Sequence, residues 1–201
     1  MARDRILYLH GFRSSPDSFK SRLMAEALQA RGLEAAWASP QLPASPAQAA
    51  RLIDHLARQW LDAGCEASDL TVIGSSLGGY YATWAAERLG CKAVLLNPAV
   101  HAARDLATQV GEHRMYHSDA PFVFLPEYVD ELKALDVAAI TRPERYFLVA
   151  ATGDEVLDWR EMRDRFQGCR QRIIPGSDHG LSDFAEHIDE VLDFALANPH
   201  R

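Results

Sequence analysis

Residues 70–78 of the chain read LTVIGSSLG, and this stretch decides the expected fold. Four residues typical of a buried strand precede a Gly-x-Ser-x-Gly turn centred on Ser76, and a helix-periodic segment then runs to Gly90. A strand, this turn and a helix in that order form the context of a nucleophile elbow, which projects its central side chain above a sheet. Ser76 is therefore the candidate nucleophile, whereas Ser75 is off-register for the apex. The amide of Leu77, at the helix N-terminus, is a candidate donor to an oxyanion.

Short apolar segments of the same kind recur along the chain, at residues 6–9, 35–37, 70–73, 93–96, 146–150 and 171–174. Helix-periodic segments separate most of them. One opens with Ser45 and Pro46, a helix cap followed by proline at the first helical position, and the last spans residues 184–195. Strands that are apolar throughout indicate a parallel sheet covered on both faces. Together with the elbow, this order predicts an α/β-hydrolase fold, with a doubly wound, mostly parallel, six-stranded sheet in three layers.

The interval between Leu96 and Tyr146 is longer than a crossover helix requires. We expect helices near residues 104–110 and 128–137, and a short helical cap over a binding site, although a plain surface insertion is the alternative. The chain is thus predicted to be one domain, residues 1–201, with a cap insertion at about 99–144. Two interpretations of its apolar side chains stay open, an acyl pocket or an anchor for the insertion. These side chains are Phe122, Phe124, Leu125 and Tyr128.

A serine nucleophile needs a base, and the base needs an acid to orient it. His179 lies in a polar loop between the last strand and the last helix, where this fold delivers its base. Asp154 follows the fifth strand, so that Ser, Asp and His occur in the expected order. Glu155 and Asp158 are alternatives for the acid, and Asp158 could equally cap a helix beginning near Trp159.

The segment His10-Gly11-Phe12 ends the first strand, beside the elbow strand of a doubly wound sheet. The amide of Phe12 is therefore the expected second oxyanion donor, and His10 is expected to fix the loop by hydrogen bonding. A metal site at His113, His117 and Asp119 is a further possibility in the cap, since a helix would bring both imidazoles to one face. No clear third ligand exists, so no metal is expected there.

The chain carries 21 basic and 28 acidic residues, a formal charge of −7. This charge balance argues against nucleic-acid and anionic-membrane partners, because both bind preferentially to a basic protein surface. No signal peptide or spanning segment is evident, and the three cysteines have no metal-like or CxxC spacing, so a cytoplasmic protein with buried, reduced cysteines is expected. The expected partner is a small-molecule ester or thioester, bound by a monomer or homodimer. No cofactor is expected.

Five segments carry a resemblance to a known family: residues 8–16 (YLHGFRSSP), 74–83 (GSSLGGYYAT), 97–99 (NPA), 153–157 (GDEVL) and 176–179 (GSDH). They resemble the YqiA/YcfP family of small bacterial α/β-hydrolase esterases. The resemblance implies an esterase or acyl hydrolase with Ser76, Asp154 and His179 as its triad, acting through an acyl-enzyme. The same triad serves acyl-CoA thioesterases and hydrolases of amide or carbon–carbon bonds. A catalytically silent binding protein and a scaffold protein working through its cap are the alternatives from other classes.

Overall fold

The computed structural model describes residues 4–116 and 118–197. A six-stranded sheet in the order β2-β1-β3-β4-β7-β8 forms its centre, and all its neighbouring strands are parallel. The strands are β1 (Arg5–Leu9), β2 (Trp37–Ala38), β3 (Leu70–Ser75), β4 (Lys92–Leu96), β7 (Tyr146–Ala151) and β8 (Arg170–Ile174). The predicted doubly wound α/β fold is confirmed.

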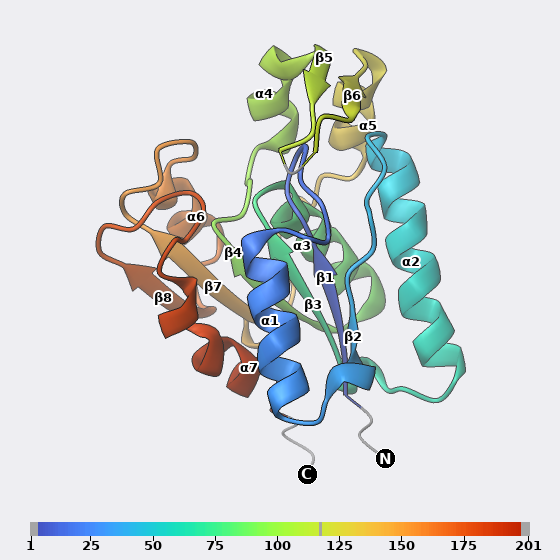
Figure 1. Ribbon diagram of the computed structural model, residues 1–201, viewed down its shortest axis with the longest axis vertical. Helices are drawn as coiled ribbons and strands as arrows, with labels where there is room; N and C mark the ends of the chain where they lie inside the picture. The colour runs from blue at the N-terminus through green and yellow to red at the C-terminus, as the bar shows by residue number, and fades with distance from the viewer. Residues whose placement is uncertain (1–3, 117, 198–201) are drawn as a thin grey trace.

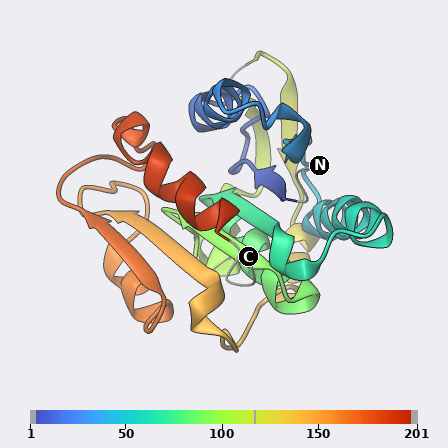
Figure 2. The same cartoon turned by 90° about the horizontal axis from the view of Figure 1, so that it is seen from below.

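The central strands are apolar throughout because successive side chains enter two different cores. In β1, Leu7 and Leu9 pack into one core, whereas Ile6 and Tyr8 pack into the other. The first core is covered by α2 (Pro46–Asp62), α3 (Leu77–Leu89) and α6 (Trp159–Arg165). The second is covered by α1 (Phe19–Ala30) and α7 (Ile188–Leu196), so helices flank the twisted sheet on both sides (Figure 2).

The strand order reverses at β1, because β2 lies on one side of it and β3 on the other. Loops leaving the carboxyl ends of β1 and β3 diverge to opposite faces and leave a crevice between them, which is where open α/β sheets bind ligands. In Figure 1 these carboxyl ends lie at the top. The two best sequence motifs, residues 8–16 and 74–83, therefore meet at this crevice.

The excursion between β4 and β7 stands above the sheet (Figure 1) and contains α4 (Ala102–Leu106), β5 (Gly111–Arg114), β6 (Pro121–Phe124) and α5 (Glu127–Ala134). The two predicted helices exist, but the first continues only as a 3-10 turn over Ala107–Gln109 and the second ends at Ala134. The cap also contains an element that the sequence analysis did not predict, because β5 and β6 pair as an antiparallel hairpin. Each strand has four residues, too few for periodicity to reveal it.

Smaller differences concern element ends. The predicted second strand at residues 35–37 is mostly a 3-10 turn, with β2 limited to Trp37–Ala38. The final helix begins as a 3-10 turn, Phe184–Glu186, before α7. The α2 start is as predicted, since Ser45 Oγ accepts a hydrogen bond from the Gln48 amide and Pro46 occupies the first turn. Cys91 is buried, whereas the other two cysteines are half-buried. Within the described ranges, none of the helices combines the length and apolarity needed to cross a bilayer.

Candidate active site

Ser76 lies at the turn between β3 and α3, the position predicted for an elbow. Its backbone angles, φ 54° and ψ −119°, are unfavourable for a residue with a side chain, and the surrounding hydrogen bonds hold it there. Its amide donates to Leu96 O at 3.0 Å, and its carbonyl accepts from the amides of Gly79 (2.9 Å) and Ala99 (3.0 Å). The turn is therefore fixed by both the helix that follows it and the neighbouring strand β4.

Glycines allow the elbow to pack closely against β1 and the loop that follows it. A Cβ at Gly78 would lie 1.9 Å from the carbonyl oxygen of Leu9, so the elbow helix can approach β1 only because that position lacks a side chain. A Cβ at Gly11 would lie 3.2 Å from the Cβ of Ser76. The loop after β1 thus rests directly against the candidate nucleophile.

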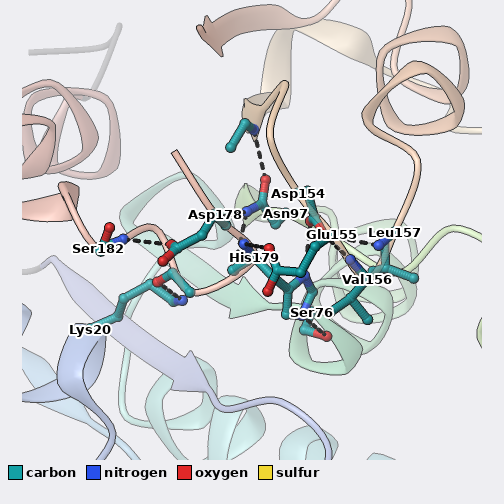
Figure 3. Close-up of polar contacts among 12 residues, drawn as sticks. Lys20, Ser76, Asn97, Asp154, Glu155, Val156, Leu157, Asp178, His179 and Ser182 are labelled. Carbon is teal, nitrogen blue, oxygen red and sulfur yellow. Dashed lines mark hydrogen bonds and ion pairs between the residues drawn. The ribbon is translucent and has the colours of Figure 1, made fainter. Parts of the chain in front are cut away.

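Three side chains from different loops form one hydrogen-bonded series (Figure 3). His179 Nε2 lies 3.0 Å from Ser76 Oγ, and His179 Nδ1 lies 2.8 Å from Asp154 Oδ2. The Asp154 side chain is fully buried, and its other oxygen accepts the amides of Val156 and Leu157, both at 2.8 Å. Three donors therefore hold one carboxylate in a fixed orientation toward the imidazole.

The two alternatives for the acid lie elsewhere. Asp158 caps α6, where its Oδ1 accepts the amide of Arg160 at 2.9 Å. Glu155 accepts the backbone amide of His179 at 3.0 Å and does not contact the imidazole. Of the three acids considered from the sequence, the structure brings only Asp154 to the His179 ring, while Glu155 supports the loop that carries it.

The amides proposed for an oxyanion, those of Phe12 and Leu77, belong to residues that line the same cavity as Ser76 and His179. Leu77 is the first residue of α3, so its amide has no intrahelical acceptor. His10 is buried beneath the neighbouring loop. Its Nε2 accepts the Leu42 amide at 2.9 Å, and its Nδ1 lies 2.9 Å from Gly11 O, an arrangement that requires a neutral imidazole with the proton on Nδ1.

Asn97, at the end of β4, is identifiable in the sequence only as a residue that stops a strand. In the structure it is completely buried, and its Nδ2 donates to the carbonyls of Asp178 (3.0 Å) and His179 (3.1 Å). Its Oδ1 accepts the amide of Ala151 at 2.8 Å, where β7 ends just before the Asp154 loop. One side chain therefore connects the loops that carry the acid and the base.

Lys20 is a second residue that sequence reasoning missed. Its ammonium donates to Gly180 O, beside His179, from the first turn of α1 (Figure 3). Burial lowers the pKa of Lys20 to about 8, although the negative charges of Asp178 and Asp154 act in the opposite direction. A signal existed, since Lys20 precedes the buried Met24 and Leu28 by one and two helical turns and so lies on the apolar face of α1.

The cavity above Ser76 has a volume of about 910 Å³ and is open to solvent on one side. Figure 3 places Val156 and Leu157 on one side of His179 and Lys20 on the other. Most of the cavity walls are apolar, and the larger apolar and aromatic side chains are those of Tyr8, Phe12, Phe19, Leu77, Leu106, Tyr116, Val156 and Leu157. Four apolar cap residues were considered from the sequence either as an acyl pocket or as an anchor for the insertion. None of them lines this cavity: Phe122, Phe124, Leu125 and Tyr128.

The metal site considered at His113 required that residue to lie on a helix, which it does not. His113 lies on β5, its Nε2 is 2.7 Å from Gln109 O, and its ring packs on Phe12. Asp119 pairs with Arg114 at 3.5 Å, and His117 lies outside the described residues. Among residues 4–116 and 118–197, His, Cys, Asp and Glu form no group of three suited to a metal ion.

Known structures with the same architecture include several esterases and lipases. Est1E from Butyrivibrio proteoclasticus superposes with a TM-score of 0.70 at 16% identity, over 98% of this chain and 89% of that one. A monoacylglycerol lipase from Paleococcus ferrophilus has a TM-score of 0.69 at 16% identity, over 97% and 95%. An esterase domain from Rhodothermus marinus has a TM-score of 0.64 at 21% identity, over 96% and 85%. At these identities the likeness establishes the α/β-hydrolase fold.

The sequence match is more specific than the structural one. Residues 5–196, nearly the whole chain, match the sequence model described as "Uncharacterised protein family (UPF0227)", which is the YqiA family. The resemblance carried by the motifs at residues 8–16 and 74–83 is thereby confirmed, and the chain belongs to this family.

Proposed function

We propose that the chain is a serine esterase that hydrolyses small carboxylic esters or acyl thioesters through an acyl-enzyme. The observation that carries this proposal is the series from Ser76 through His179 to Asp154, with distances of 3.0 and 2.8 Å, at the floor of an open cavity. Support also comes from Phe12 and Leu77, whose amides are the proposed oxyanion donors, because both residues line the same cavity.

In the proposed reaction, Ser76 Oγ attacks the substrate carbonyl carbon while His179 Nε2 accepts its proton. Asp154 keeps the other ring proton on Nδ1 and stabilises the imidazolium that forms. The carbonyl oxygen becomes an oxyanion that accepts hydrogen bonds from the amides of Phe12 and Leu77. His179 then protonates the departing alcohol or thiol, leaving an acyl ester on Ser76.

Water completes the cycle. His179 accepts a proton from a water molecule that attacks the acyl-Ser76 carbonyl, and the proton then passes to Ser76 Oγ as the acid leaves. The open side of the cavity admits this water. The apolar walls suit the hydrocarbon part of an acyl or aryl group, whereas a strongly charged substrate would meet few complementary side chains.

The test is a panel of p-nitrophenyl esters and acyl-CoA thioesters, assayed with the wild type and with Ser76→Ala. A feruloyl ester belongs in the panel because a structure of Est1E holds ferulic acid. Ser76→Ala should abolish turnover and labelling by a fluorophosphonate, while Ser75→Ala should still be labelled. Absence of turnover on every substrate together with no labelling of the wild type would favour a silent binding protein, and turnover by Ser76→Ala would refute the nucleophile.

A further inference from the structure

The loop after β1, which carries Phe12, is fastened to the cap hairpin formed by β5 and β6. The Phe12 ring meets the rings of Phe122 and Phe124 edge to face, with centroids 5.1 and 5.3 Å apart and interplanar angles of 85° and 89°. The His113 ring packs on it as well, at 5.8 Å. Edge-to-face pairs of this kind favour a defined ring orientation.

The next residue, Arg13, adds polar contacts to the same hairpin. Its Nε donates to the carbonyl of Arg114 at 2.7 Å, and its own carbonyl accepts the Tyr116 amide at 2.9 Å. Its guanidinium lies 4.5 Å from the centroid of the Tyr116 ring. Arg13 also has a φ of 59°, a conformation that a non-glycine residue keeps only when its surroundings impose it.

The cap is itself attached to the core close to the elbow. Tyr80 lies in the first turn of α3, the helix that follows the elbow. Its hydroxyl donates a hydrogen bond to the carbonyl of Leu132 in α5 at 2.6 Å. Glu131 accepts hydrogen bonds from Ser45 Oγ and the Ala47 amide at the start of α2. Phe124 is 1% exposed and packs on Tyr128 of the same cap. The hairpin is therefore a fixed support rather than a free lid.

The hairpin contacts the loop after β1 through side chains that do not line the cavity. Phe12 lines the cavity, whereas Phe122 and Phe124 pack on its ring without lining that cavity. At Gly11 the same loop touches the candidate nucleophile, because a Cβ there would lie 3.8 Å from Ser76 Oγ. A displacement of the loop away from the hairpin therefore changes the position of the Phe12 amide relative to the atom that attacks the substrate.

We propose that the cap hairpin positions the Phe12 amide as an oxyanion donor, with Phe122 and Arg13 as positioning residues. This inference rests on the esterase function proposed above. It assigns the cap a role in the transition state in addition to any role in substrate binding. Loss of an oxyanion donor costs about 100- to 1,000-fold in kcat, and a misplaced donor costs part of that.

The test compares Phe122→Ala with Val123→Ala, its matched control. Val123 is the next residue of β6, points to the opposite face and is 42% exposed. Phe122→Ala should lower kcat by about 10- to 100-fold with KM changed less than about two-fold, and Val123→Ala should change neither. Affinity for a trifluoromethyl ketone, whose adduct with Ser76 places an oxyanion in the site, should fall by the same factor as kcat/KM. Phe122→Leu should recover most of both losses.

Arg13→Met provides a second variant if Phe122→Ala does not fold, because it keeps an apolar stem but removes the hydrogen bond to Arg114. It too should lower kcat and trifluoromethyl-ketone affinity together. Unchanged kcat in both folded variants, or a raised KM with a new acyl-chain preference at unchanged kcat, would overturn the inference. Fluorophosphonate labelling of the wild type distinguishes failure of the hairpin role from failure of the proposed esterase function. If the wild type is labelled and active but the variants are unaffected, only the hairpin role is refuted. If the wild type is unlabelled and inactive, the esterase function is refuted.

Discussion

Asn97→Asp is the variant from which we expect the clearest combined loss of stability and turnover. Aspartate has the same shape, so the variant creates no cavity, and it tolerates the positive φ of 43° nearly as well as asparagine does. Its Oδ1 still accepts the amide of Ala151. Only the Nδ2 group changes, and an oxygen then faces the carbonyl oxygens of Asp178 and His179.

The size of the effect follows from these contacts. Two donated hydrogen bonds are lost, at about 1 kcal/mol each, and the new buried oxygen, which has no hydrogen-bond donor, costs about 1–3 kcal/mol more. The free energy of unfolding should therefore fall by about 3–5 kcal/mol at neutral pH, and Tm by about 10 °C for a chain of this size. Because the histidine loop loses its tether, kcat should also fall by about 10-fold or more.

The sign of the pH dependence gives an independent check. Burial and the two carbonyl oxygens disfavour the charged form, so the pKa of the new carboxyl should be higher in the folded state than in the unfolded state. The loss in free energy of unfolding relative to wild type should be smallest below about pH 4 and should grow as pH rises toward neutrality. Denaturant unfolding followed by circular dichroism, at several pH values and beside ester kinetics, measures both effects. A loss below about 1 kcal/mol at neutral pH with unchanged kcat would refute the tethering role.

Three further predictions concern other parts of the site. Burial lowers the pKa of Lys20 in the folded state from 10.5 to about 8, so the unfolded chain binds that proton more tightly. In denaturant titrations, the free energy of unfolding of the wild type should therefore rise relative to that of Lys20→Met between about pH 8 and 10.5. A difference between the two proteins that stays constant over this range would contradict the prediction. Gly78→Ala should lower the free energy of unfolding by more than about 4 kcal/mol or prevent folding, since its Cβ would lie 1.9 Å from Leu9 O. A near-normal Tm would contradict so close an approach of α3 to β1. Asp154→Asn should lower kcat by about 10,000-fold, whereas Asp158→Asn, which still caps α6, should leave kcat nearly unchanged; the reverse pattern would exchange their roles.

The sheet could be predicted from sequence because its central strands are buried on both faces and therefore carry an unbroken apolar signal. The elbow and the order of Ser76, Asp154 and His179 could be predicted because each of these residues follows a strand, β3, β7 or β8, at the same edge of the sheet. The sequence left three candidate acids, Asp154, Glu155 and Asp158. All three follow β7 in one loop, and the direction of each carboxylate depends on which backbone amides it meets.

The supports of the site could not be predicted, because each depends on contacts between segments distant in sequence. The hairpin of β5 and β6 is half-exposed and short, and its inner face is defined by Phe12, which lies far earlier in the chain. Asn97 is marked only as a strand end until the carbonyls of the His179 loop are placed beside it. Lys20 is the exception, since a lysine on the buried face of an amphipathic helix is visible in the sequence and calls for a buried acceptor.

Backbone strain explains why the site needs so many supports. Within the described residues, the non-glycine residues with positive φ all lie in loops at this edge of the sheet: Arg13, Ser76, Asn97, Ser177 and Leu181. Each such conformation costs about 1–2 kcal/mol, so together they oppose folding by an amount comparable to the whole stability of a typical domain. The loops cannot hold these conformations alone, and the sheet, the Asn97 amide and the cap hairpin must impose them. Releasing one support should therefore relax one loop and impair turnover while the two hydrophobic cores keep the sheet folded.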